Sequence, residues 1–126
     1  MTKLLIDNGA DVNVKNKKGL TPVFNTFYTL TNMKYLVQAG ANVNAVTNDG
    51  LNTIHYAVLL NDIKGAEFLI QNGADPLFKT TKGSIWFLPV LRGKTINIPK
   101  NTSPFTLAKL FGNREKIMEL LKKYTK

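Results

Sequence analysis

One phrase occurs three times in the chain at nearly constant spacing. The sequence reads NGADVNVK from Asn8, AGANVNAV from Ala39 and NGADPLFK from Asn72, so the copies begin 31 and 33 residues apart. A period in this range is typical of repeat proteins, in which each unit buries its apolar face only against its neighbours. The chain is therefore expected to fold as a stack of similar units.

The middle unit, residues 47–79, indicates what each unit contains. It opens with the turn signal TNDG, and the apolar run NTIHYAVLL then predicts a short, largely buried helix. Asn61 and Asp62 stand where a second helix, IKGAEFLIQ, would be capped. Gly73 suits the end of that helix, because glycine adopts positive φ at little steric cost. Each unit is thus predicted as turn, helix, helix, glycine stop and extended link.

Three segments resemble a known family. GLTPVF from Gly19, GLNTIHYA from Gly50 and TSPFTLA from Thr102 are similar to the Thr-Pro-Leu-His-x-Ala signature of the ankyrin repeat, whose period is 33 residues. The resemblance implies an all-α repeat solenoid. Its stacked helix-turn-helix units would carry projecting β-hairpin fingers, and the third finger would be enlarged.

The resemblance also implies roles for residues at the start of the first helices. Thr21 and Ser103 would help to start these helices, with Pro22 and Pro104 at the first helical position, where no backbone N–H is needed. His55, the only histidine, would have a structural role, because this position usually hydrogen-bonds backbone near the hairpin. A catalytic role is disfavoured, since no acid or nucleophile stands at a supporting spacing.

The resemblance divides residues 1–126, expected to form a single ankyrin-repeat domain, into four units. These are a partial repeat at 1–15, repeats at 16–46 and 47–79, and a repeat at 80–126 with an insertion at about 84–101. The first full unit is two residues shorter than the second. We expect the missing residues in the turn between its helices, around FYTLTNM.

The two ends of the chain differ in their expected surfaces. The N-terminal segment MTKLLIDNG supplies only the end of a second helix, so its apolar surface would need a longer natural chain or a second copy to cover it. Self-association through this incomplete repeat is therefore an open interpretation. The C-terminal run NREKIMELLKKYTK has an apolar stripe on one face and a polar, solvent-exposed face that includes Arg114. This pattern predicts a helix that caps the C-terminal end of the stack.

The insertion extends the third finger and contains the only tryptophan. Trp86, Phe87 and Leu88 lie in the arm SIWFLPVL, and Arg92 to Lys94 look like a turn before the arm TINIP. Three interpretations remain open. The insertion folds back and its aromatic residues pack against the first helices, it is an exposed aromatic finger that binds a partner, or it is disordered.

Ankyrin repeats generally bind proteins through the finger tips and the concave face of the first helices, so the resemblance implies a binding surface at the matching positions. On the concave face these positions are mostly apolar in this chain, which favours contact with a protein. The predicted partner-binding residues are Lys17, Lys18, Leu20, Tyr28, Asn48, Asp49, Leu51, Leu59, Leu60, Lys82, Trp86, Phe87, Leu88, Arg92, Lys94, Leu110 and Phe111.

The formal net charge is +9, and the location of the charges indicates the kind of partner. Lysines gather in or near the predicted fingers, whereas most acidic residues lie elsewhere. This distribution of charges favours a protein partner with acidic patches. A row of solvent-exposed lysines without a binding function would give the same distribution. Direct binding of nucleic acid is disfavoured, because the chain has no DNA-binding helix-turn-helix motif, zinc finger or aromatic-basic sheet motif.

Composition and motifs argue against several other functions. The chain has no cysteine and one histidine, so we expect no disulfide and no metal site. It has no phosphate-binding loop, no dinucleotide fingerprint and no poised pair among its eight carboxylates, so no catalytic or cofactor-binding residue is expected. No apolar stretch could span a bilayer and the N-terminus lacks a signal-peptide pattern, which predicts an intracellular, cytoplasmic location without a membrane partner.

The sequence thus predicts a non-enzymatic protein–protein interaction module that uses its concave face and fingers. Three other functions remain open. The chain could be an inhibitor or immunity-type protein that occludes another protein, a scaffold segment of a larger chain, or a protein that binds nucleic acid along its basic edge.

Overall fold

The computed structural model describes residues 11–88, 94–111 and 114–125. Within these ranges the chain forms short helices and one pair of strands, joined by tight loops. The elements are the 3-10 helix η1 (Pro22–Asn25), the α-helices α2 (Leu30–Gln38), α3 (Thr53–Leu60) and α4 (Ile63–Gln71), the strands β1 (Ser84–Leu88) and β2 (Lys94–Ile98), and the helices α5 (Pro104–Phe111) and α6 (Glu115–Tyr124).

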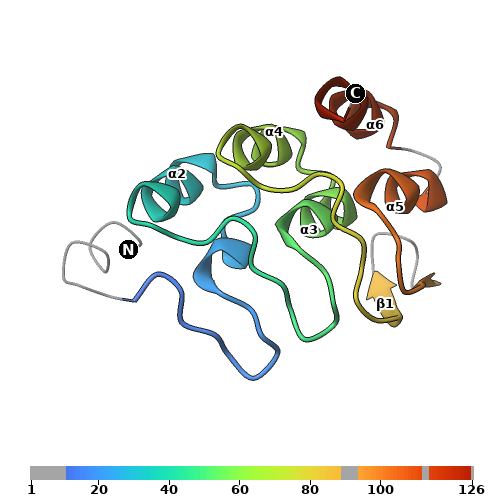
Figure 1. Cartoon of the computed structure of the whole chain (residues 1–126), viewed down its shortest axis with the longest axis horizontal. Coiled ribbons are helices and arrows are strands. Elements are labelled where there is room, and N and C mark those ends of the chain that lie inside the picture. The colour runs from blue at the N-terminus through green and yellow to red at the C-terminus, as the bar shows by residue number, and fades with distance from the viewer. Residues whose placement is uncertain (1–10, 89–93, 112–113, 126) are drawn as a thin grey trace.

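The helices stack side by side in two rows, as Figure 1 shows. One row contains η1, α3 and α5, which are the first helices of successive units, and the other contains α2, α4 and α6. Helix α3 packs against α4 within its unit and against α5 of the next unit, while α4 packs against α6. Each unit thus contacts its neighbours, and the helical repeat solenoid is confirmed.

The second unit forms because its caps are complete. Asn52 caps α3 by accepting a hydrogen bond from the His55 backbone N–H at 3.0 Å, while the His55 ring accepts one from the Asn52 N–H at 3.2 Å. Asp62 caps α4 through Gly65 N–H, as the sequence predicts. Gly73 then ends the unit with a φ of +100°.

A continuous apolar core runs along the stack. The second unit supplies its middle, with Leu51, Ile54 and Leu69 fully buried, and the last unit extends it through Leu107 and Leu121. In the C-terminal helix, the predicted apolar stripe is buried and Glu119 and Lys122 stay exposed. The continuity of the core ties the units together, because no unit could bury its apolar face alone.

The first unit differs from the prediction in its first helix. Residues 22–25 form only the 3-10 turn η1, so the shortening falls within the first helix and not only in the turn after it. The chain then reverses at Tyr28, which has a φ of +70°, and its N–H donates to the Asp62 carboxylate at 2.8 Å. That contact with the next unit holds the irregular turn in place.

The predicted role of Thr21 as a helix cap is wrong. The Phe24 N–H, which a capping hydroxyl would accept, instead donates to the Thr21 carbonyl in 3-10 geometry at 3.1 Å. The Thr21 hydroxyl oxygen is buried and has no hydrogen-bond partner among the described residues. At the last unit the prediction is confirmed, because the Ser103 hydroxyl accepts from the Thr106 N–H at 3.2 Å.

Replacing Thr21 by valine is expected to leave stability unchanged or raise it by about 1 kcal/mol, because the valine removes a buried hydroxyl without a partner. Thr53 is the matched control, since its buried hydroxyl donates to the Val43 carbonyl at 2.6 Å. Thr53→Val is expected to cost about 1 to 2 kcal/mol by leaving that carbonyl unpaired. Chemical unfolding followed by circular dichroism measures both, and equal losses in the two variants would contradict this assignment.

The prediction that Arg114 lies on a solvent-exposed face is also wrong. Its side chain is 6% exposed, its Nε donates to the Val58 carbonyl at 3.0 Å, and its guanidinium lies 4.3 Å from the centre of the Phe111 ring. The Val58 carbonyl also accepts from the Asn61 N–H at 3.2 Å, and a cation is favourable at this end of the helix dipole. Arg114 therefore joins the last unit to the one before it.

The insertion forms an antiparallel hairpin beside the stack. Trp86 of β1 pairs with Ile96 of β2, and Ser84 pairs with Ile98, which is fully buried in the core. At the base of the hairpin, Thr80 and Thr102 exchange hydrogen bonds, including Thr80 N–H to the Thr102 carbonyl at 3.0 Å. Within the described residues, β1 and β2 are the only paired strands, and the loops at 16–20 and 47–51 are hydrogen-bonded turns.

Candidate protein-binding surface

A hollow of about 600 Å³ opens between the first two finger turns and β1. Residues from three successive units surround it, although they are far apart in the sequence. We call it the finger hollow. Its lining residues are Lys17, Lys18, Leu20, Asn48, Asp49, Tyr56, Ile85 and Trp86.

Backbone hydrogen bonds hold the walls of the hollow in register. The Asn48 N–H donates to the Lys18 carbonyl at 3.0 Å, and the Asn48 side chain donates to the Lys17 carbonyl at 2.8 Å. On the other side, the Thr81 N–H donates to the Gly50 carbonyl at 3.1 Å. The three finger turns are therefore tied laterally, and the hollow is preformed, which reduces the entropic cost of binding.

An aromatic cluster forms the floor of the hollow. The Tyr56 ring meets the Trp86 ring edge to face at 5.2 Å and the Phe24 ring at 4.7 Å, and it stacks on Phe27 at 6.5 Å. These rings come from η1, the turn after it, α3 and β1. Aromatic contacts of this kind orient large apolar side chains at fixed angles, so Trp86 is held in place although it is only partly buried.

The Tyr56 hydroxyl is kept neutral in this environment. The pKa of Tyr56 is raised from 10 to about 12, chiefly by burial and also by the Asp49 carboxylate, while a hydrogen bond with the Thr47 side chain lowers it in part. The phenol is protonated at physiological pH. It can act as a hydrogen-bond donor and acceptor at the floor of the hollow.

The structure brings six of the predicted binding residues together in the hollow: Lys17, Lys18, Leu20, Asn48, Asp49 and Trp86. The Trp86 ring packs against Tyr56, as expected if the insertion folds back, while the neighbouring Ile85 is 74% exposed. The described part of the insertion thus combines features of the first two interpretations. Tyr28, Leu60, Lys82, Leu110 and Phe111 lie outside the lining of the hollow.

Two predicted binding residues belong to the core instead. Leu51 is fully buried and Leu59 is 1% exposed, so neither side chain can reach a partner. The prediction was wrong because both side chains belong to the continuous core, and Leu59 lies on α3, which packs against α5 of the next unit. Arg92 lies outside the described residues, as do the side chains of Phe87, Leu88 and Lys94.

Sequence reasoning missed two residues of the hollow, Tyr56 and Ile85. Tyr56 occupies the variable position x of the Thr-Pro-Leu-His-x-Ala signature, between His55 and Ala57. A large aromatic residue at a variable position could have been identified from the sequence as a candidate binding residue. Ile85 precedes Trp86 in the insertion, but its exposure depends on how β1 lies against the stack. Only the tertiary structure gives that.

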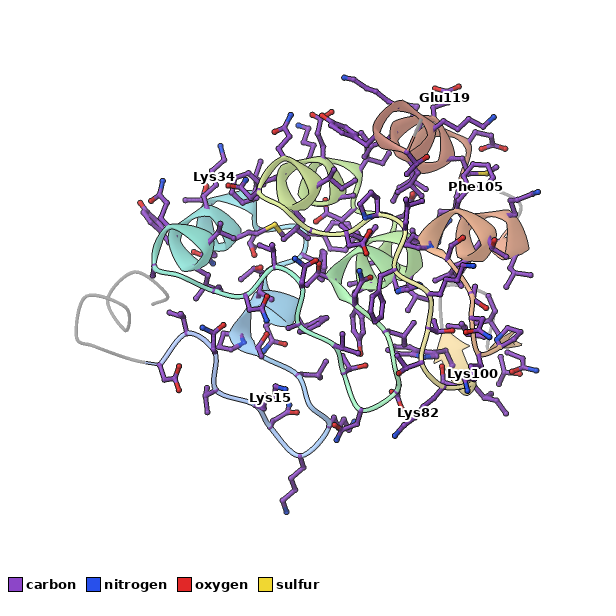
Figure 2. The ribbon with its side chains drawn as sticks, in the orientation of Figure 1. Lys15, Lys34, Lys82, Lys100, Phe105 and Glu119 are labelled. Atoms are coloured by element: carbon purple, nitrogen blue, oxygen red, sulfur yellow. The ribbon has the colours of Figure 1, made fainter. Side chains whose placement is uncertain are left out.

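Several exposed lysines lie on the side of the molecule that carries the finger turns, and others lie on α2, α4 and α6. Figure 2 shows Lys15, Lys82 and Lys100 along this side, while Lys34 and Glu119 lie on the side of the second helices. Asp49 is the acidic residue that lines the hollow, beside Lys17 and Lys18. The hollow therefore has a mainly cationic rim.

Among the described residues, no group of three or more His, Cys, Asp or Glu side chains is placed to hold a metal ion. None of the helices in the described ranges is long and apolar enough to cross a membrane.

Comparison with known proteins agrees with the repeat architecture. Residues 1–80 match the family described as "Ankyrin repeats (3 copies)". The chain belongs to the ankyrin-repeat family. Repeats of this family are generally protein–protein interaction modules.

Three curated relatives are similar to part of the chain. A fowlpox virus protein named as an ankyrin repeat protein is 31% identical over 75 residues, covering 56% of this chain and 13% of its own length. A similarly named protein of Acanthamoeba polyphaga mimivirus is 33% identical, covering 57% of this chain and 10% of its own length. The ankyrin repeat and LEM domain-containing protein 1 homolog of Caenorhabditis elegans is 34% identical, covering 48% and 8%. The match thus spans about a tenth of the length of these relatives.

Proposed function

We propose that the chain is a protein-binding module whose partner docks in the finger hollow. The observation that carries this proposal is the convergence of apolar, aromatic and lysine side chains from three units around one preformed concavity. Buried aromatic anchors with a polar rim are the usual features of an energetically important contact region. The family membership supports a protein as the partner.

The proposed architecture keeps the unit boundaries given above, with repeats at 16–46, 47–79 and 80–126 and a partial repeat at 1–15. We propose that β1 and β2 form an enlarged third finger, which extends the binding surface beyond the two shorter finger turns. Further proposed contacts are at Tyr28, Leu60, Lys82, Leu110 and Phe111, which do not line the hollow, and at Phe87, Leu88, Arg92 and Lys94.

Ile85→Asp is expected to abolish partner binding, because it places a charge on an exposed apolar residue that lines the hollow. Leu77→Asp is the matched control, since Leu77 is also an exposed apolar residue, at 59%, but does not line the hollow. Affinity capture from native lysate, with mass spectrometry, compares the two variants with the intact chain. A partner that Ile85→Asp retains and Leu77→Asp loses would contradict the proposed site.

The basic finger side supports a second candidate function, binding of nucleic acid. Phosphate contacts release counterions, so such binding would weaken steeply with salt, whereas docking in the finger hollow, where apolar contacts join the two rim lysines, would weaken less steeply. Capture repeated at low and high salt therefore separates the two functions. An inhibitor that occludes another protein would use the same hollow, and loss of the partner's activity on titration would identify it.

A further inference from the structure

The strand β1 has an open edge. It pairs with β2 along one side only, in a two-stranded antiparallel sheet that runs from Ser84 opposite Ile98 to Leu88 opposite Lys94. In such a pair, alternate residues direct their backbone N–H and C=O groups away from the partner strand. Within the described part of the chain, no backbone hydrogen bond reaches these groups at the other edge of β1.

The open edge of β1 borders the finger hollow. Ile85 and Trp86 of β1 line the hollow, and the lining includes no residue of β2. Trp86 is held against Tyr56, which fixes the strand beside the floor of the hollow. A chain lying along β1 would therefore have the hollow and its lysines within reach of its side chains.

The edge also lacks the features that usually prevent strand pairing. Exposed edges in native proteins are commonly protected by lysine, proline or a covering segment, and the sequence of β1, SIWFL, contains neither residue. The sequence of β2, KTINI, begins with Lys94, and a proline follows each strand, Pro89 after β1 and Pro99 after β2. The strand β1 therefore differs from β2 in having no lysine within the strand.

We propose that β1 binds an extended acidic segment of a partner protein by strand addition. This inference rests on the proposed function, because it names the partner segment and its binding mode in the same hollow. The added strand forms backbone hydrogen bonds with β1. The side chains on one face of the added strand enter the hollow. Carboxylates of the segment meet Lys17 and Lys18 at the rim, which supplies the charge preference.

A second copy of this chain is a poorer occupant of the same edge. Each copy carries a formal net charge of +9, so pairing two β1 edges would bring two cationic rims together. An acidic segment removes that repulsion and replaces it by attraction. Charge complementarity therefore favours a partner of opposite charge over self-association.

The test uses short blocked peptides and the fluorescence of Trp86, which is the only tryptophan in the chain. A peptide of alternating glutamate and valine is expected to shift Trp86 emission in a saturable manner. Two derivatives carry N-methyl groups on either the glutamate or the valine nitrogens, and each derivative blocks one edge of the peptide strand. One derivative is expected to lose binding and the other to keep it, because only one edge faces β1.

Charge is tested on the protein with a matched pair of variants. The double variant Lys17→Glu, Lys18→Glu is expected to bind the peptide about ten-fold more weakly, since it reverses the rim. The control Lys64→Glu, Lys116→Glu changes the net charge equally, at exposed positions on α4 and α6 that do not line the hollow. The control is expected to bind as the unmodified chain does.

Several outcomes would overturn the inference. Equal binding of all three peptides would show that the β1 edge is not used, and equal binding of a lysine–valine peptide would exclude an acidic segment. Absence of any saturable shift, or a concentration-dependent dimer that the peptide does not dissociate, would also overturn it. Each of these results leaves the proposed function to be decided by the Ile85→Asp capture experiment, so the two can fail separately.

Discussion

His55→Ala is expected to destabilise the chain by about 3 to 5 kcal/mol, because it removes a fully buried side chain, leaves the Asn52 N–H unpaired and removes one of the two hydrogen bonds to the Thr102 carbonyl. The His55 Nδ1 accepts a hydrogen bond from the Asn52 N–H, so Nε2 carries the proton and donates to the Thr102 carbonyl at 2.8 Å. The ring thus caps α3 and joins it to the last unit. Thermal unfolding followed by circular dichroism measures the loss.

The pH dependence of stability distinguishes this role from simple packing. Burial lowers the pKa of His55 from 6.5 to about 4, and the bond to Thr102 opposes this in part. The unfolded chain therefore binds the proton more strongly, and the stabilisation is complete above pH 6.5 and is lost as the pH falls toward 4. His55→Gln keeps a polar side chain at a capping-box position but does not titrate, so its stability should fall less over this range. Parallel pH profiles for the two proteins would contradict the assignment.

Gly50→Ala is expected to destabilise the chain by about 3 kcal/mol or more and to weaken partner binding. Gly50 has a φ of +82°, and a Cβ added there would lie 2.7 Å from the Lys82 backbone nitrogen. The backbone of the next finger would have to move, which would break the hydrogen bond from Thr81 N–H to the Gly50 carbonyl. Urea unfolding gives the stability change.

Gly40 provides the matched control for Gly50. Its φ is +97°, but a Cβ added there would meet no atom within 4 Å. Gly40→Ala therefore carries the cost of the left-handed backbone alone, about 1 to 2 kcal/mol. The difference between the two variants isolates the contact between neighbouring fingers, and equal losses would show that this contact contributes nothing.

The second unit shows how much of the fold was predictable. Its helix starts at Asn52 and Asp62 and its stop at Gly73 follow from residues that lie within one turn of each other. The first unit was less predictable, because the turn that follows η1 is held by a hydrogen bond from the Tyr28 N–H to Asp62, 34 residues away. Local pattern carries no signal for such a contact.

The candidate site was predicted in part for the same reason. The finger-turn residues Lys17, Lys18 and Asn48 were found because their positions repeat with the period of the units. Leu51 and Leu59 were misplaced because the repeat pattern identifies a position in the unit but not what stacks upon it. Tyr56 and Ile85 were missed because their contacts and exposure depend on the docking of the hairpin.

The amino-acid sequence by itself determined the repeat period, the caps of the second unit and the positions of the turn glycines. Hydrogen bonds and backbone angles set within a few residues decide these features. The tertiary structure decided the 3-10 turn of the first unit, the burial of Arg114 beneath α3 and the joining of three units around the finger hollow. These features depend on lateral stacking between segments that are distant in the chain. The arrangement that forms is the one in which the side chains fill the space between the segments and the buried backbone groups find hydrogen-bond partners.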